Sequence, residues 1–163
     1  MTENSTFEIP LIPTGCRPLD HLLGGGLPVG KLTLFDVRLP ADSAALTRAF
    51  EPMWARGVRR ISIGDTYEEG VIWTRTDMLP QDDSGIMQLG KDAAKAGSAI
   101  IAVHGLELPK VFKFWAWVRF TVEGEVLKCI KNAVAPCQGY VVRLDLGPED
   151  PLPDYIAPKL AML

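Results

Sequence analysis

The chain has 163 residues, of which 47% are apolar and 23% charged, the balance of a single globular domain with a hydrophobic core. Twenty acidic against seventeen basic side chains give a net charge of −3, which excludes a general polyanion binder of the histone type but leaves room for a local basic patch. Residues 1–6 are polar, and the apolar run after them is broken by Pro10 and Pro13. The sequence therefore predicts no targeting segment and no membrane helix, and we expect a cytoplasmic protein.

Three cysteines, Cys16, Cys129 and Cys137, are an odd number without the C-x-x-C spacing of a zinc site. We expect reduced thiols, no disulfide framework, and no bound metal or cofactor.

The first half of the chain alternates short apolar segments with turns. A helical turn is predicted over 19–23, ending at the triple glycine 24–26, and a strand over 31–37. A helix follows over 41–56, with Asp42 and Ser43 as N-cap candidates. A short buried strand is predicted over 60–64, and residues 73–84 are expected to be mostly loop, with a short strand over 71–74.

The second half begins with a predicted helix over 86–96, followed by the continuous apolar run 98–104, which is typical of a parallel strand covered on both faces. Three strands are predicted over 115–122, 125–131 and 139–146, and residues 148–163 form a proline-rich tail. This order predicts an α/β fold: a mainly parallel sheet flanked by helices, with a C-terminal antiparallel ribbon. The predicted domain covers residues 1–147.

Residues 25–32, GGLPVGKL, nearly spell the phosphate loop G-x-x-x-x-G-K-[ST]. A working loop needs a strand before it and a helix after it, so that backbone N–H groups converge on the phosphates. Here a helical turn comes before and a strand after, and Leu32 offers no hydroxyl for magnesium. We therefore do not assign a phosphate loop to this segment.

The same region carries a longer pattern, T-G-x-x-x-L-D-x-L-L-G-G-G-L-x-x-G. It is matched by Thr14, Gly15, Leu19, Asp20, Leu22, Leu23, Gly24, Gly25, Gly26, Leu27, Pro28 and Gly30. This stretch resembles the opening of the RecA-like ATPase family, especially its KaiC and RadA branches. The resemblance extends over most of residues 9–147 and implies a truncated RecA-like domain.

In that family the phosphate loop (Walker A) follows the first core strand and is rich in glycine. The equivalent residues here, 36–43, contain neither glycine nor lysine, and Asp36 and Asp42 would face the phosphates with like charge. Asp65 lies where the family has an acidic pair, but Tyr67 stands in place of the catalytic Glu, Glu68 is one step late, and no clear Walker B strand is found. The resemblance therefore implies a pseudo-ATPase, not an enzyme.

Two further positions are read from the family. The strand 98–104 is similar to the later core strand whose last polar residue senses the terminal phosphate, which places His104 there. The closing segment resembles the family's terminal β-ribbon at Lys131 and Asn132, whereas Ala133 replaces the Arg that reaches a neighbour's nucleotide. Lys131 is therefore a candidate for a subunit or partner interface; the alternative is a plain surface lysine.

Residues 108–120 interleave aromatic and cationic side chains, the combination that proteins use to bind single-stranded nucleic acid. Residues 114–120 alternate like a half-buried strand. We expect Lys110, Phe112 and Lys113, on the loop before that strand, to be the DNA contacts.

Phe7 and Ile9 belong to an apolar N-terminal arm. Such an arm could add a strand or an aromatic anchor to a neighbouring copy or partner, or pack on its own domain.

These observations lead to a non-catalytic RecA-like accessory protein of DNA recombination or repair. It would bind single-stranded DNA, a recombinase or other repair protein, or copies of itself. The alternative is a KaiC-like regulatory module that binds a protein and no DNA. A third hypothesis, an enzyme reusing the vacant cleft with Asp36, Asp65 and His104 as acid and base groups, has no supporting spacing in the sequence.

Overall fold

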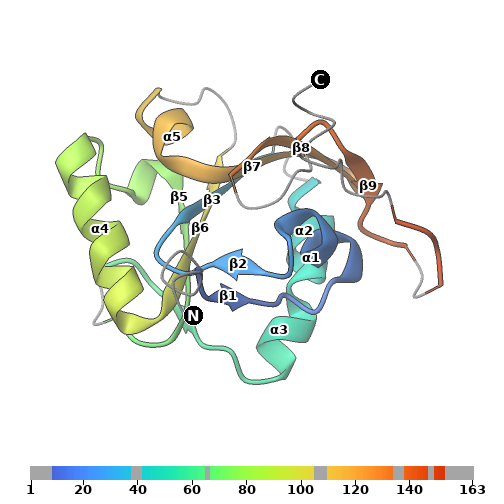
Figure 1. The fold of residues 1–163 in the computed structure, drawn as a ribbon, viewed down its shortest axis with the longest axis horizontal. Coiled ribbons are helices and arrows are strands. Elements are labelled where there is room, and N and C mark those ends of the chain that lie inside the picture. The colour runs from blue at the N-terminus through green and yellow to red at the C-terminus, as the bar shows by residue number, and fades with distance from the viewer. Residues whose placement is uncertain are drawn as a thin grey trace, which may run out of the picture.

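A seven-stranded sheet forms the centre of the molecule (Figure 1). The computed structural model describes residues 9–37, 42–64, 67–104, 110–133, 138–146 and 149–152. In spatial order the strands are β4 (Arg60–Ile61), β5 (Gly70–Arg75), β6 (Ser98–His104), β3 (Leu32–Val37), β7 (Ala116–Glu123), β8 (Val126–Asn132) and β9 (Val141–Arg143). The first five run parallel, and β7, β8 and β9 pair antiparallel. The predicted α/β class with a C-terminal antiparallel ribbon is confirmed.

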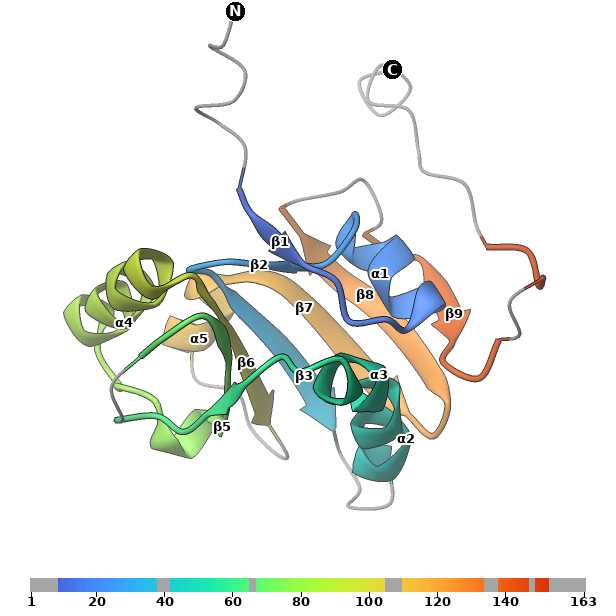
Figure 2. The ribbon, with the colours of Figure 1, turned by 90° about the horizontal axis from the view of Figure 1, so that it is seen from below.

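Helices cover both faces of this sheet. On one face lie α1 (Arg17–Leu23), α2 (Asp42–Ala49) and α3 (Glu51–Ala55), packed on a core that includes Phe35 and Phe120. On the other lie α4 (Asp83–Ala96) and α5 (Lys110–Trp115), packed on a second core that includes Leu34 and Ala102. A short 3₁₀ turn, η2 (Thr76–Met78), precedes α4. Figure 2 shows β3 between β6 and β7, inside the sheet, where both of its faces are covered.

The helix predicted over 41–56 is two helices. α2 ends at Ala49 and α3 begins at Glu51, with Pro52 in its first turn. Proline has no backbone N–H and clashes with the preceding turn of a continuous helix, but it fits the first turn of a new one. The apolar stripe still faces the core, since Leu46, Phe50 and Met53 are fully or almost fully buried.

The strands at both edges of the sheet are shorter than predicted. β4 covers only Arg60–Ile61 of the predicted 60–64, and Arg60 is exposed, so the expectation of a buried strand is wrong for that residue. β9 covers Val141–Arg143 of the predicted 139–146. An edge strand has one pairing partner instead of two, so fewer hydrogen bonds extend it.

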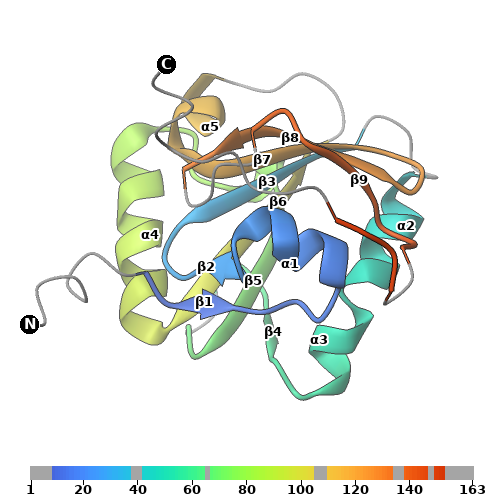
Figure 3. The same cartoon turned by 45° about the vertical axis from the view of Figure 1, so that its right-hand side comes forward.

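The stretch matched by the RecA-like pattern is held together by local hydrogen bonds to the side chain of Asp20. The backbone N–H and hydroxyl of Thr14 both donate to Asp20 Oδ1 at 2.8 Å, and the N–H of Gly15 donates to Oδ2 at 3.0 Å. A Cβ on Gly26 would lie 2.6 Å from the backbone of Ile12, so this position accepts only glycine. β1 (Leu11–Ile12) and β2 (Leu27–Pro28) form a small antiparallel pair beside α1 (Figure 3). The pattern therefore serves the fold of the segment entering β3.

The chain ends lie largely outside the described residues, including the tail predicted over 148–163, of which 149–152 are described. Within the described ranges, no helix combines the length and the apolar character that crossing a bilayer requires.

Candidate functional site

The carboxyl end of β3 carries an ion pair with β7. Oδ2 of Asp36 accepts hydrogen bonds from Nε of Arg119 at 3.0 Å and from its Nη2 at 2.7 Å. The side chains of Arg119 and Asp36 are only 23% and 15% exposed, so water screens the pair less than it would at the surface. Oδ1 of Asp36 is buried and has no hydrogen-bond partner among the described residues. A carboxylate, neutralised from within the sheet, therefore occupies the strand end that precedes residues 38–41.

β6 ends beside this ion pair. In the register of β3 and β6, Asp36 pairs with His104, so the two residues lie level at one edge of the sheet. The carboxyl ends of parallel strands are where α/β proteins bind ligands. Asp65, residues 38–41 and the His104 side chain lie outside the described part of the chain. Glu68 pairs with Arg59 at 2.9 Å, and both side chains are largely exposed.

α5 occupies residues where the sequence predicted a loop followed by a strand. Phe112 is fully buried in the second core, whereas Phe114 is 72% exposed. Two residues apart on a helix point about 200° away from each other, so one ring faces the core and the other faces solvent. The expectation that Phe112 contacts DNA is therefore wrong for this structure, because its ring is not accessible. The predicted strand over 114–120 begins only at Ala116.

The lysines near α5 have two different surroundings. Lys110 and Lys113 are exposed, as a nucleic-acid contact requires. Lys131 on β8 donates from Nζ to the backbone carbonyls of Lys113 and Phe114, each at 3.2 Å. A cation at the end of a helix satisfies carbonyl groups that the helix leaves unpaired. In this chain Lys131 contacts its own α5; its predicted contact with another subunit stays a prediction.

A groove of about 250 Å³ opens between α4 and the starts of β3 and β7. Its lining includes Leu32, Leu79, Ile86, Met87, Leu89, Ile100, Trp115 and Trp117, together with Lys31 and Lys91. The Lys31 ammonium lies 4.4 Å from the ring centre of Trp117, a cation–π contact. The indole N–H of Trp115 donates to Asp83 Oδ1 at 2.7 Å, which fixes the ring against the first turn of α4.

The groove exists because α4 approaches β3 closely at one point. Gly30 has a φ of +76°, and a Cβ there would lie 2.6 Å from the Cβ of Ala94. The N–H of Gly30 also donates to the Ser98 carbonyl at 2.8 Å, which fixes this turn to β6. The turn and α4 therefore touch at one end of the groove, and the side chains of Met87 and Trp115 stand further along it.

Sequence reasoning missed this site. Its residues come from the segment before β3, from α4 and from the junction of α5 with β7, and only the folded chain brings them together. Trp115 and Trp117 were assigned to an alternating strand. Of the run KVFKFW only Trp115 lines the groove, so no local sequence signal marked this site.

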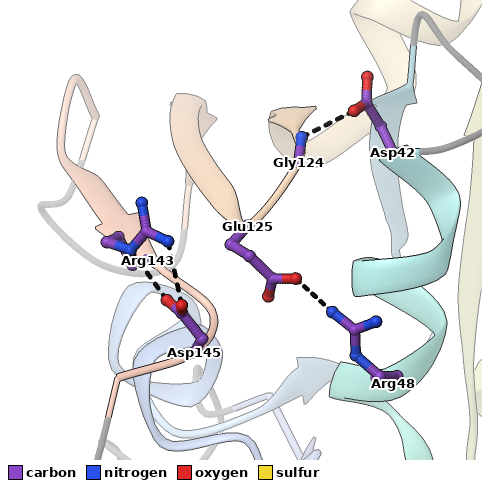
Figure 4. Close-up of polar contacts among 6 residues, drawn as sticks. All are labelled: Asp42, Arg48, Gly124, Glu125, Arg143 and Asp145. Carbon is purple, nitrogen blue, oxygen red and sulfur yellow. Dashed lines mark hydrogen bonds and ion pairs between the residues drawn. The ribbon is translucent and has the colours of Figure 1, made fainter.

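A second hollow of about 490 Å³ lies between α1, α2 and the end of β9. Three charged residues of its lining have partners in Figure 4: Arg48 and Glu125 pair with each other, and Asp145 pairs with Arg143 at 2.9 Å. The hydrogen bond and the guanidinium of Arg143 lower the pKa of Asp145, while Asp145 raises that of Arg143. Because these side chains already have partners within the chain, they are less available to bind a ligand than the side chains of the groove.

Asp42 stabilises the β7–β8 turn. Its Oδ1 accepts a hydrogen bond from the N–H of Gly124 at 2.7 Å (Figure 4). Asp42, predicted as an N-cap candidate, is the first residue of α2, and its side chain ties that helix to the ribbon.

The described thiols are buried and free. Burial raises the pKa of Cys129 to about 11 and also raises that of Cys16, so both stay protonated and unreactive at neutral pH. No cluster of three or more His, Cys, Asp or Glu side chains that could hold a metal occurs in the described ranges.

The N-terminal arm is described from Ile9 onward, so Phe7 lies outside the described residues. The carbonyl of Pro10 accepts from the N–H of Val29 at 2.9 Å, and Leu11 pairs with Pro28. This part of the arm adds a strand to its own chain, one of the two arrangements expected. The interface predicted for Ile9 stays a prediction.

Comparisons with known proteins give no match, either to a protein-family model or to a curated protein.

Proposed function

We propose that the protein is a non-catalytic RecA-like accessory factor that acts by binding single-stranded DNA and a recombinase or other repair partner. The observation that carries the proposal is the carboxylate of Asp36, held by Arg119 at the end of the inner strand β3. A nucleotide-binding RecA-like domain would present backbone N–H groups and a lysine to the phosphates there. The Asp36–Arg119 pair presents a carboxylate acceptor at this strand end instead of a hydrogen-bond donor for a phosphate, so the scaffold would be kept for binding alone.

The arrangement of the strands supports a RecA-like core. The sequence resemblance assigns 31–37 to the first core strand and 98–104 to the strand that carries a phosphate sensor. A sensor must lie next to the strand that leads into the phosphate loop. β6 lies beside β3, with His104 level with Asp36, as that assignment requires.

The surface of α5 supports nucleic-acid binding. Phe114 is 72% exposed and in edge contact with Trp115, with ring centres 5.4 Å apart. Lys110 and Lys113 are exposed on the same short helix. Aromatic rings that stack on bases and cations that follow the phosphates are the means by which proteins bind single strands without strong sequence preference. We therefore assign the stacking role to Phe114 in place of Phe112.

Titration with fluorescent oligo-dT over a series of salt concentrations tests the DNA-binding half. Replacing Lys110 and Lys113 by Ala should weaken binding at low salt and reduce the slope of log K against log salt by about 1.4, the loss of two single-strand phosphate contacts. Phe114→Ala should cost about tenfold or more in affinity, since stacking is worth about 1–3 kcal/mol per base. The control removes the same charge elsewhere, by Arg48→Ala with Arg59→Ala, and should leave the slope less affected.

Absence of binding at low salt would contradict the DNA-binding half. Calorimetry with ATP and magnesium tests the non-catalytic half, for which we expect no heat of binding. Micromolar affinity for ATP would overturn it.

A KaiC-like regulatory module that binds only protein is the second candidate. The observation that favours it is the apolar groove beside α4, with Met87 43% exposed at its wall. A null result with DNA together with binding of a protein segment in this groove would select it.

A further inference from the structure

The groove between α4 and the starts of β3 and β7 has the size of one large side chain. Its volume is about 250 Å³. An apolar cavity of about 150 Å³ holds one benzene molecule, and sites for drug-sized ligands begin near 300 Å³. One aromatic ring, or a Leu or Met side chain, therefore fits the space.

The chemistry of the lining separates a protein side chain from a nucleobase. Every polar side-chain group in the lining is a donor: the ammonium groups of Lys31 and Lys91 and the indole N–H groups of Trp115 and Trp117. The Trp115 N–H is already bound to Asp83. Thymine has no amino group and carries oxygens that accept from these donors, so the oligo-dT titration below tests it. The amino groups of adenine, cytosine and guanine need acceptors, which these side chains do not supply, and a buried donor without a partner is costly. A hydrocarbon side chain has no such need.

The charges at the groove favour an acidic occupant. Lys31 lies over Trp117 and Lys91 is exposed on α4, and neither has an ion-pair partner among the described residues. A carboxylate placed next to the apolar anchor would meet these ammonium groups, and opposite charges across an interface direct the partner and speed its association.

The apolar surface continues beyond the groove. Met87 is 43% exposed at the wall, and Phe114 is 72% exposed and in contact with Trp115. These two are among the few large apolar side chains exposed in the described ranges. Met87 lines the groove and Phe114 lies beyond it, so a partner that covers both must be larger than the single side chain that fills the groove.

We infer that the groove docks a short acidic segment of a partner protein, with one large apolar side chain in the groove and carboxylates against Lys31 and Lys91. The inference rests on the partner-binding half of the proposed function and names the chemistry of that partner. The DNA-binding half uses Lys110 and Lys113 and does not depend on it.

The probe is a capped peptide, Glu-Asp-Phe-Asp-Glu, titrated into the full chain labelled with ¹⁵N. The indole N–H resonances of Trp115 and Trp117, which line the groove, should shift saturably, while those of Trp54 and Trp73, which do not line it, should not. A peptide with Ala in place of Phe should bind about tenfold more weakly or worse, because it leaves the groove empty.

Substitutions of lysines inside and outside the groove test the charges. Lys31→Gln with Lys91→Gln should weaken binding about threefold to tenfold, whereas Lys95→Gln, exposed one turn further along α4 and not lining the groove, should change it less than about twofold. The dispersed amide spectrum of each variant reports that it is folded.

Three outcomes would overturn the inference. One is the absence of saturable indole shifts up to about 5 mM peptide, the weakest binding that a single anchor should give. Another is equal binding by a peptide with Lys in place of the acids. The third is a saturable shift of the Trp117 indole in a titration with oligo-dT alone, which would assign the groove to DNA and leave the proposed function intact. The Trp115 indole does not decide this outcome, because its ring contacts Phe114. If oligo-dT fails to bind but the peptide binds, the inference stands and only the DNA-binding half fails.

Discussion

Phe112 and Phe114 are two residues apart on the short helix α5, yet one ring is buried and the other is exposed. Phe112 is fully buried in the second core, which also contains side chains of α4 and β3, and Phe114 is 72% exposed. A period of 3.6 residues per turn places the two rings on different sides of α5, whereas a loop or strand would not have fixed this difference in advance. Phe112 therefore has a structural role in the core, whereas Phe114 is free for the binding role proposed above.

Alanine substitution should separate these two roles. Phe112→Ala should lower the free energy of unfolding by about 3–5 kcal/mol, because it leaves a cavity in the core. Phe114→Ala should change it by less than about 0.5 kcal/mol, since the ring is exposed. Urea denaturation followed by circular dichroism measures both. Equal losses of stability would mean that α5 is not packed as described.

At the scale of elements, the contact between α4 and the turn before β3 sets the width of the groove. Gly30 faces Ala94 where the two elements meet, and no side chain fits between them. The turn cannot move away from α4 without breaking the hydrogen bond from the Gly30 N–H to the Ser98 carbonyl. The groove is thus determined by how closely two elements approach, more than by any one of its lining residues.

Gly30→Ala should therefore be costly and should disturb the groove. The positive φ and the overlap with Ala94 together predict a loss of about 2–4 kcal/mol in the free energy of unfolding. Gly57→Ala is the matched control: its φ is +98°, but a Cβ there meets nothing within 4 Å. It should cost only about 1–2 kcal/mol, the strain of the backbone alone. Thermal or urea unfolding of both variants measures the difference, and equal costs would show that α4 yields to the added methyl group.

For the whole molecule, the sheet has a rigid interior and two weak edges. β3 and β6 each have a strand on both sides and helices on both faces, while β4 and β9 are short edge strands. Backbone hydrogen bonds open most readily where few neighbours cover them. The proposed DNA surface and the groove both lie on the α4–α5 face, over the interior strands β3 and β7.

Hydrogen exchange should follow this order. Amides of Leu34–Phe35 in β3 and of Ile100–Ile101 in β6 should exchange slowest, and those of β4 and β9 should exchange fastest, because an edge strand opens without breaking the core. Mass spectrometry of peptic fragments gives the comparison. Protection of β9 equal to that of β6 would indicate that another surface covers this edge in solution.

The sequence alone determined the class of the fold and most of its elements. Apolar periodicity marks the helix faces and the buried strands regardless of what lies beside them, so β3, β5, β6 and α4 appear close to where they were predicted. The break at Pro52 was missed although proline is a local signal for the end of a helix. The short edge strands were missed because their length depends on missing strand neighbours.

Only the tertiary structure decided which side chains share a surface. Lys31, Met87 and Trp117 are far apart along the chain, and no local pattern records that one groove collects them. The pairing of Asp36 with Arg119 and of Lys131 with the end of α5 likewise comes from strand order and register. Periodicity reports which face of an element is apolar, but the identity of the neighbour on that face is set by packing across the whole chain.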